Sequence, residues 1–167
     1  MHCARLAAMM LSITLAWMSP ARAQDAKFDP SRDAAADVAH AVAQAKASAR
    51  NVLVDVGGEW CSWCHILDDF FAADGDARAL RDQDYVTVKV NWSPQNRNAA
   101  LLARWPRIDG YPHLFVLDAD GKLLRSQSTG ALELGRGYDR AKLLAFLRRY
   151  APHATILPAP ATPSRAG

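Results

Sequence analysis

The chain has 167 residues, half of them hydrophobic, and a formal net charge of +3 at pH 7. This length and composition are enough for one globular domain with a substantial core. No basic run with interleaved aromatic residues is present, so nucleic acid is not an expected partner.

The first 23 residues read as an export signal. Arg5 gives a positive start, residues 6–17 are mostly apolar, and Ala21-Arg22-Ala23 is a small-x-small cleavage site. The apolar stretch is too short to span a bilayer comfortably as a helix. We therefore expect cleavage near Ala23 and no stable membrane insertion, with a retained anchor as the alternative. The remaining chain would carry a formal charge of +1.

Hydrophobic periodicity predicts helices and strands that alternate along most of the remaining chain. Asp29-Pro30 is a favourable helix start, combining a capping oxygen with a proline in the first turn. Periodicity and breaking residues then predict a helix to about residue 50, a buried strand over 52–56, a helix over 62–72, a short helical turn over 77–81, a strand over 85–90, a helix over 96–104, strands over 114–117 and 122–128 around a turn at 118–121, a loop over 130–137 and a helix over 138–150.

This order predicts an α/β domain over residues 24–151. Strands separated by helices imply parallel pairs, and the final hairpin adds an antiparallel edge to a mixed sheet. Residues 152–167 contain four prolines among alanine and threonine, which predicts a disordered tail.

Two cysteines remain after the predicted cleavage, Cys61 and Cys64. A disulfide between them would close a very small loop and restrict the unfolded chain little, so the pair is better explained by reactivity. Cys61 falls in the first turn of the predicted helix, where free N–H groups and the helix dipole stabilise a thiolate and lower its pKa. Cys64 lies three residues later on the same face, within reach of the Cys61 sulfur.

These cysteines stand among other segments that resemble the thioredoxin superfamily. The shared features are a strand acid at Asp55 six residues before Cys61, Lys89 in the next strand, the loop Gly110-Tyr111-Pro112 and the segment Gly130-Ala131-Leu132. The resemblance covers roughly residues 35–150. It implies the thioredoxin fold, a mixed central sheet with helices on both faces.

The resemblance also implies roles for individual residues. Cys61 would be the attacking thiolate and Cys64 the buried resolving thiol. Asp55 would lie under the pair and move the proton of Cys64, and Lys89 would tune that acid. Pro112 would pack against the disulfide through a cis peptide bond.

A second set of residues would contact the substrate. The resemblance implies that the backbone of Tyr111 pairs with an extended substrate segment. Trp60 and Trp63 would form an apolar rim around the reactive sulfur.

The chain departs from thioredoxins proper at three places. Ser62-Trp63 replaces Gly-Pro between the cysteines, Gly57 replaces an aromatic residue, and His65 replaces a lysine and is a candidate modulating residue. The pattern is more similar to exported thioredoxin-like domains, including the C-terminal domain of membrane thiol-disulfide interchange reductases. The resemblance implies a periplasmic protein-disulfide oxidoreductase that acts as a reductant on protein substrates, without a bound cofactor. A membrane thiol reductase would supply its electrons.

Other interpretations stay open at this stage. Cys61-Ser62-Trp63-Cys64-His65 satisfies the C-x-x-C-H attachment motif for c-type haem. Cys61, Cys64 and His65, with His113 as a further donor, could form a copper or zinc carrier site. Asp55 and Lys89 could also be solvated strand residues without a role at the site.

Overall fold

The computed structural model describes residues 28–152. The predicted export signal and residues 153–167 of the predicted tail lie outside the described residues, and the predicted domain boundaries stay predictions. Within residues 28–152, no helix has both the length and the apolar character needed to cross a bilayer.

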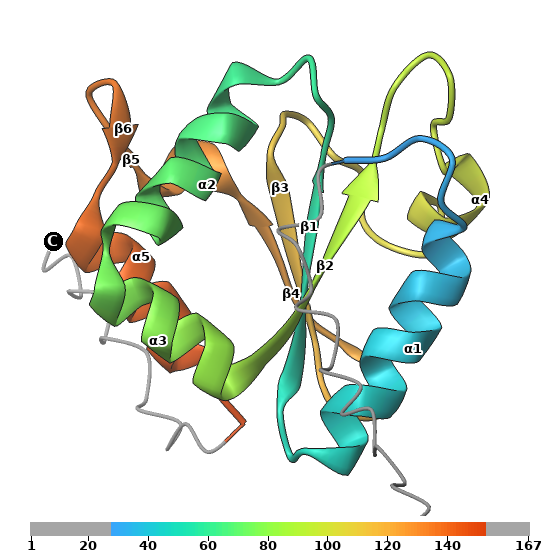
Figure 1. Ribbon diagram of the computed structural model, residues 1–167, viewed down its shortest axis with the longest axis horizontal. Coiled ribbons are helices and arrows are strands. Elements are labelled where there is room, and N and C mark those ends of the chain that lie inside the picture. The colour runs from blue at the N-terminus through green and yellow to red at the C-terminus, as the bar shows by residue number, and fades with distance from the viewer. Residues whose placement is uncertain (1–27, 153–167) are drawn as a thin grey trace, which may run out of the picture.

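Helices and strands alternate along most of the described chain (Figure 1). In chain order they are α1 (Ala34–Ala47), β1 (Asn51–Gly57), α2 (Ser62–Ala73), α3 (Gly75–Asp84), β2 (Tyr85–Asn91), α4 (Ala99–Leu102), β3 (His113–Leu117), β4 (Leu123–Ser128), the 3₁₀ helix η1 (Thr129–Leu132), β5 (Glu133–Leu134), β6 (Gly137–Tyr138) and α5 (Arg140–Arg149).

The central sheet has the strand order β2-β1-β3-β4 and is mixed, as the sequence predicts. β1 and β2 are parallel, whereas β3 is antiparallel to both β1 and β4. The expectation of parallel pairing for every helix-separated strand was therefore wrong at β3. The reason is that the chain between β2 and β3 contains only the four-residue helix α4 and re-enters the sheet from the end at which β2 leaves it.

β1 is the central strand and is buried along its whole length. Its alternate side chains contribute to two separate hydrophobic cores. Leu53 packs with residues of α2, α3 and α5, and Val52, Val54 and Val56 pack with residues of α1 and α4. Helices therefore cover both faces of the sheet, and Asp55 and Gly57 point to the same side as Leu53.

α1 begins later than the sequence predicts. Asp33 is its N-cap and accepts the N–H groups of Ala35 and Ala36, both at 3.0 Å. The Asp29 carboxylate instead accepts the N–H of Ser31 at 2.8 Å and closes a turn. The prediction of a helix start at Asp29-Pro30 was wrong because a second capping residue stands four positions further on.

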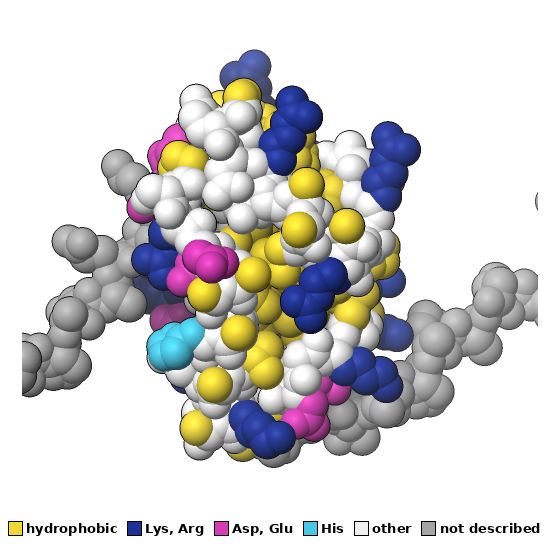
Figure 2. Space-filling model, turned by 90° about the vertical axis from the view of Figure 1, so that its right-hand side faces the viewer, with side chains coloured by type: hydrophobic (Ala, Val, Ile, Leu, Met, Phe, Trp, Pro, Cys, Tyr) yellow, Lys and Arg dark blue, Asp and Glu magenta, His cyan; other side chains and the backbone are white. Residues whose placement is uncertain are grey.

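Three other element boundaries also differ from the prediction. The helix predicted over residues 96–104 shrinks to α4, and Trp105 and Ile108 pack on the sheet from a loop. The face that this loop shares with α1 shows hydrophobic side chains gathered between lysine and arginine side chains (Figure 2). The turn predicted over 77–81 is the ten-residue helix α3, and the loop predicted over 130–137 contains η1 and the β5–β6 ladder.

Candidate active site

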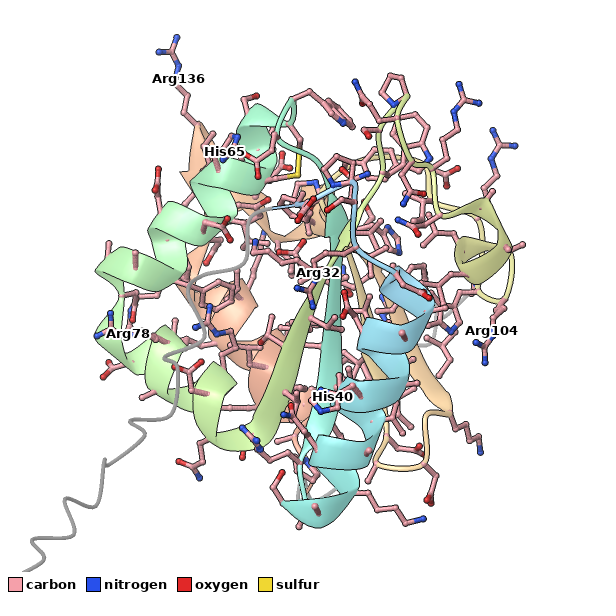
Figure 3. The ribbon with its side chains drawn as sticks, turned by 45° about the vertical axis from the view of Figure 1, so that its right-hand side comes forward. Arg32, His40, His65, Arg78, Arg104 and Arg136 are labelled. Atoms are coloured by element: carbon pink, nitrogen blue, oxygen red, sulfur yellow. A yellow bond between two sulfur atoms is a disulfide. The ribbon has the colours of Figure 1, made fainter. Side chains whose placement is uncertain are left out.

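Cys61 and Cys64 form a disulfide at the start of α2, next to His65 (Figure 3). Cys61 is the N-cap of α2, and its Sγ accepts the N–H of Cys64 at 3.1 Å. Cys61 is 4% exposed, whereas Cys64 is fully buried. The outer sulfur therefore belongs to Cys61 and lies where the helix N-terminus favours negative charge, as the sequence predicts.

The absence of a side chain at Gly57 allows the disulfide to lie against the end of β1. A Cβ atom at this position would overlap the Sγ of Cys64 and would lie 3.0 Å from Cζ of Phe28. Close approach of sulfur and backbone therefore requires glycine here.

Asp55 lies two residues before Gly57 on the same side of β1, and it is 5% exposed. Its Oδ2 accepts a hydrogen bond from Lys89 Nζ at 3.1 Å, and its Oδ1 has no hydrogen-bond partner among the described residues. Burial raises the pKa of the Asp55 carboxyl above its ordinary value, and the positive charge of Lys89 opposes that rise. The interpretation of Asp55 as a solvated strand end is wrong.

Lys89 lies opposite Asp55 in the parallel register of β1 and β2, and its side chain is 11% exposed. Burial alone would lower the pKa of the Lys89 ammonium, but the charges of Asp55 and Asp68 raise it above its ordinary value. Lys89 is therefore a buried cation that holds two carboxylates. The alternative in which it simply faces water is also wrong.

Asp68 also bonds to Lys89, and it was not among the residues predicted from the sequence. Its Oδ1 accepts a hydrogen bond from Lys89 Nζ at 2.5 Å, and its side chain is 41% exposed. Asp68 follows Cys64 by four residues on α2, which places both on one face of the helix. That spacing is the sequence signal that could have identified it.

An exposed aromatic cluster borders the disulfide. Trp60 is 54% exposed, and its indole N–H donates to the carbonyl oxygen of Trp92 at 2.8 Å. Tyr111 stacks on Trp92 with ring centroids 5.0 Å apart and meets the Trp60 ring edge-on at 5.6 Å. Trp92, which the sequence did not single out, therefore belongs to this rim. A groove of about 620 Å³ continues from Trp60 and Trp92 towards Pro94.

Trp63 occupies a different position from Trp60. It is half-buried, and its ring meets Tyr138 of β6 edge-on at 5.7 Å. Trp63 therefore packs between the disulfide and the hydrophobic core that contains Leu53. Trp60 instead presents about half of its surface to solvent.

Pro112 follows Tyr111 through a cis peptide bond, as predicted. The carbonyl oxygen of Pro112 accepts the hydroxyl of the buried Thr129 at 2.6 Å. Tyr111 itself contacts the cluster formed by the two cysteines and Phe28. The structure thus brings the Tyr111-Pro112 loop to the disulfide.

Comparison with known proteins identifies the family to which this chain belongs. The model of a family described as thioredoxin-like matches residues 33–119, more than half of the chain. The chain belongs to the thioredoxin-like family. This family comprises disulfide oxidoreductases with a C-x-x-C pair, which is Cys61 and Cys64 here. A search of curated proteins gives no significant match.

Several solved structures are similar to this thioredoxin-like chain. A disulphide isomerase from Xylella fastidiosa Temecula1 is 27% identical with a TM-score of 0.64, and the match covers 73% of this chain and 94% of that one. The oxidised DsbD C-terminal domain from Neisseria meningitidis is 19% identical with a TM-score of 0.50, covering 72% and 97% of the two chains. The DsbH oxidoreductase is 19% identical with a TM-score of 0.52, covering 79% and 94%. The last two show likeness of fold.

The two histidines proposed as metal donors lie apart. His65 Nε2 lies 2.9 Å from the carbonyl oxygen of Glu59, within hydrogen-bond distance. His113 is buried with Phe115, on the side of the sheet that faces α1, and its Nε2 contacts Ser126 Oγ at 2.8 Å. The disulfide faces the other side, so His113 does not join the cysteines. Among residues 28–152 no group of three or more His, Cys, Asp or Glu side chains could hold a metal ion.

The haem interpretation needs two thiols that are free to form thioethers. In this thioredoxin-like structure the two sulfurs bond to each other and are buried against Phe28 and Tyr111. Cys61 is 4% exposed and Cys64 is fully buried in this disulfide form.

Proposed function

We propose that this chain is a periplasmic thiol-disulfide oxidoreductase that reduces disulfides in protein substrates through Cys61 and Cys64. One observation carries the proposal. Cys61 caps α2 and is 4% exposed, and Cys64 is fully buried one turn further on. An outer nucleophile with an inner resolving thiol is the arrangement that a two-step disulfide exchange needs.

The first step belongs to Cys61 in the dithiol form. Its thiolate attacks one sulfur of a substrate disulfide, a Cys61–substrate disulfide forms, and the other substrate sulfur leaves as a thiolate. The N–H of Cys64, which donates to Cys61 Sγ at 3.1 Å, favours the charged form of that sulfur.

The second step belongs to Cys64, with Asp55 as the proton acceptor. The Cys64 thiol gives its proton to the carboxylate and attacks the Cys61 sulfur. The Cys61–Cys64 bond forms, the mixed disulfide breaks, and the second substrate sulfur leaves as a thiolate. Support comes from the Asp55 oxygen that lacks a hydrogen-bond partner among residues 28–152 and from the Lys89 ammonium that holds the other oxygen. Lys89 is thus proposed as a modulating residue.

Substrate contacts are proposed for the surface next to Cys61. The backbone of Tyr111 would pair with an extended substrate segment, and Pro112 would pack against the disulfide. Trp60 is the main apolar contact, because it combines high exposure with a position held by Trp92. Half-buried Trp63 would contribute its exposed edge, and His65 would modulate the charge around the first turn of α2.

The proposed compartment rests on the export signal predicted over residues 1–23, and the proposed electron donor rests on the resemblance to domains of membrane thiol-disulfide interchange reductases. After export, oxidised protein would be re-reduced by a membrane thiol reductase. The similar Xylella fastidiosa protein is a disulphide isomerase, so isomerisation is the direction against which reduction must be tested.

Two cysteine variants test the mechanism. With a disulfide-bonded protein substrate, Cys61→Ser should abolish exchange, and Cys64→Ser should accumulate a mixed disulfide through Cys61, located by peptide mass spectrometry. Undiminished turnover by Cys61→Ser would overturn the mechanism. Soret absorbance that survives denaturation of the wild-type protein would instead indicate covalent haem.

Direction is tested by equilibrating the wild-type protein with dithiothreitol or glutathione buffers. A reduction potential near the thioredoxin value of about −270 mV supports a reductant. A value near that of protein disulfide isomerase, about −180 mV, or higher would contradict the proposed direction and leave the exchange chemistry intact.

A further inference from the structure

Phe28 lies at the centre of the site although it precedes α1 and is far from the cysteines in sequence. Its side chain is 1% exposed and forms one cluster with Cys61 and Cys64. The segment that carries it runs from the start of α1 across the end of the sheet (Figure 1). None of the roles assigned above uses this residue.

The Phe28 ring contacts two functional groups at once. One edge lies beside Gly57 and the Cys64 sulfur, because a Cβ at Gly57 would meet both. The ring face covers the Lys89 ammonium, with Nζ 4.3 Å from the ring centroid. β2 is an edge strand, and the Lys89 ammonium also contacts Asp68 of α2, whose side chain is 41% exposed. The Phe28 ring therefore covers one face of the ammonium and lies beside the inner sulfur.

Two hydrogen bonds fasten the segment around Phe28. The Phe28 N–H donates to Glu59 Oε1 at 2.9 Å, and the Pro30 carbonyl oxygen accepts from Asn96 Nδ2 at 2.9 Å. Glu59 lies two residues before Cys61, so the N-terminal segment is tied to the loop that carries the outer cysteine. The position of the ring is therefore specified by polar contacts as well as by packing.

We propose that Phe28 is a positioning residue that seals the inner half of the site, so that Cys64 exchanges its proton with Asp55 and not with bulk water. This inference rests on the proposed function and adds a residue to its second step. A polar site with an unpaired buried oxygen admits water when room is made. The ring fills that room and also stabilises the Lys89 charge across its face.

The charged groups around the ring come from several elements. Lys89 of β2 lies over the ring, Asp55 of β1 and Asp68 of α2 hold the Lys89 ammonium, and Glu59 holds the Phe28 backbone. Arg81 of α3 acts on Asp55 from further away. Removing the ring would hydrate Asp55 and Cys64 and move the titration of both towards that of ordinary exposed groups.

The test follows the reaction of the reduced protein with dithiobis-nitrobenzoate, an aromatic disulfide, by stopped flow between pH 4 and pH 9. The first nitrothiobenzoate is released when Cys61 attacks, and the second when Cys64 resolves the mixed disulfide. In Phe28→Ala the pH midpoint of the second release should fall by about one unit, and that of the first should stay unchanged. Phe28→Leu should give a smaller shift in the same direction.

Phe146→Ala is the matched control, because Phe146 is also buried, at 5% exposed, but lies in α5. It should leave both midpoints unchanged. An unshifted second midpoint in Phe28→Ala, or an equal shift in Phe146→Ala, would overturn the proposal. If Phe28→Ala does not fold, Phe28→Leu decides by the same criterion. Absence of any first release from the wild-type protein would instead overturn the proposed function.

Discussion

Asp55 and Lys89 occupy matching register positions on β1 and β2, and they form a buried ion pair with Nζ 3.1 Å from Oδ2. Their side chains are 6% and 11% exposed. A charge in such a place is stable only with its partner, because water cannot solvate it. The pair therefore links the stability of the domain to the acid that we assign to the proton step.

Removing the cation should be costly. Lys89→Met leaves the Asp55 carboxylate buried without a counter-charge, and we expect the free energy of unfolding at pH 7 to fall by about 3 kcal/mol. Urea unfolding of the oxidised protein measures this. The double variant Lys89→Met/Asp55→Asn should recover more than half of the loss. Equal stability of the single and double variants would show that the two side chains are not coupled.

The raised pKa of Asp55 predicts a pH dependence of stability. Between the ordinary carboxyl pKa and the raised folded one, the folded state binds more protons than the unfolded state, so the contribution of Asp55 falls as pH rises. Asp55→Asn removes this contribution. The stability of the variant relative to the wild type should therefore increase from pH 4 to pH 8 in parallel urea titrations. A pH-independent difference would contradict the assignment.

Trp60 should matter for protein substrates only. Trp60→Ala removes an exposed ring from the edge of the groove, and we expect kcat/KM for a protein disulfide to fall about tenfold, or about 1.4 kcal/mol. The rate with a small aromatic disulfide should stay within about twofold, since Cys61 still caps α2 in the variant. Leu134→Ala, at a residue 67% exposed on the β5–β6 ladder, is the control. Equal losses with both substrates would argue against docking.

Gly57→Ala tests the close contact of sulfur and strand. The added methyl group overlaps Cys64 Sγ, and we expect the oxidised protein to lose about 1–3 kcal/mol of stability in urea. The matched control is Gly75→Ala in α3, where an added Cβ meets nothing within 4 Å and alanine favours the helix. Unchanged stability in Gly57→Ala would mean that the disulfide has room to move.

Patterns that are local in sequence predicted most of the fold. The continuous apolar run of residues 52–56 predicts the central strand, and the stripe of residues 63–71 predicts α2. The direction of β3 could not be predicted in this way. It depends on where the chain re-enters the sheet, and the shortness of α4 belongs to that long-range geometry.

The site residues also divide into those that local sequence patterns predict and those that depend on contacts distant in sequence. Cys61 and Cys64 follow from their spacing at the start of one predicted helix, whereas Asp55 and Pro112 entered the candidate site through the resemblance. Phe28 could not be predicted because Glu59, Cys64 and Lys89 lie more than thirty residues away and no periodicity links them to it. The only sequence hint was Gly57, whose missing side chain leaves space that another segment fills.

The central claim is that the two sulfurs differ in kind, with Cys61 reactive at the helix start and Cys64 protected behind it. The most direct test is alkylation of the reduced protein with iodoacetamide across pH 5 to pH 10, with the label on each cysteine quantified by peptide mass spectrometry. We predict that Cys61 is labelled first at every pH and that its midpoint lies at least one unit below that of Cys64. Labelling of Cys64 as fast as Cys61 would contradict the account.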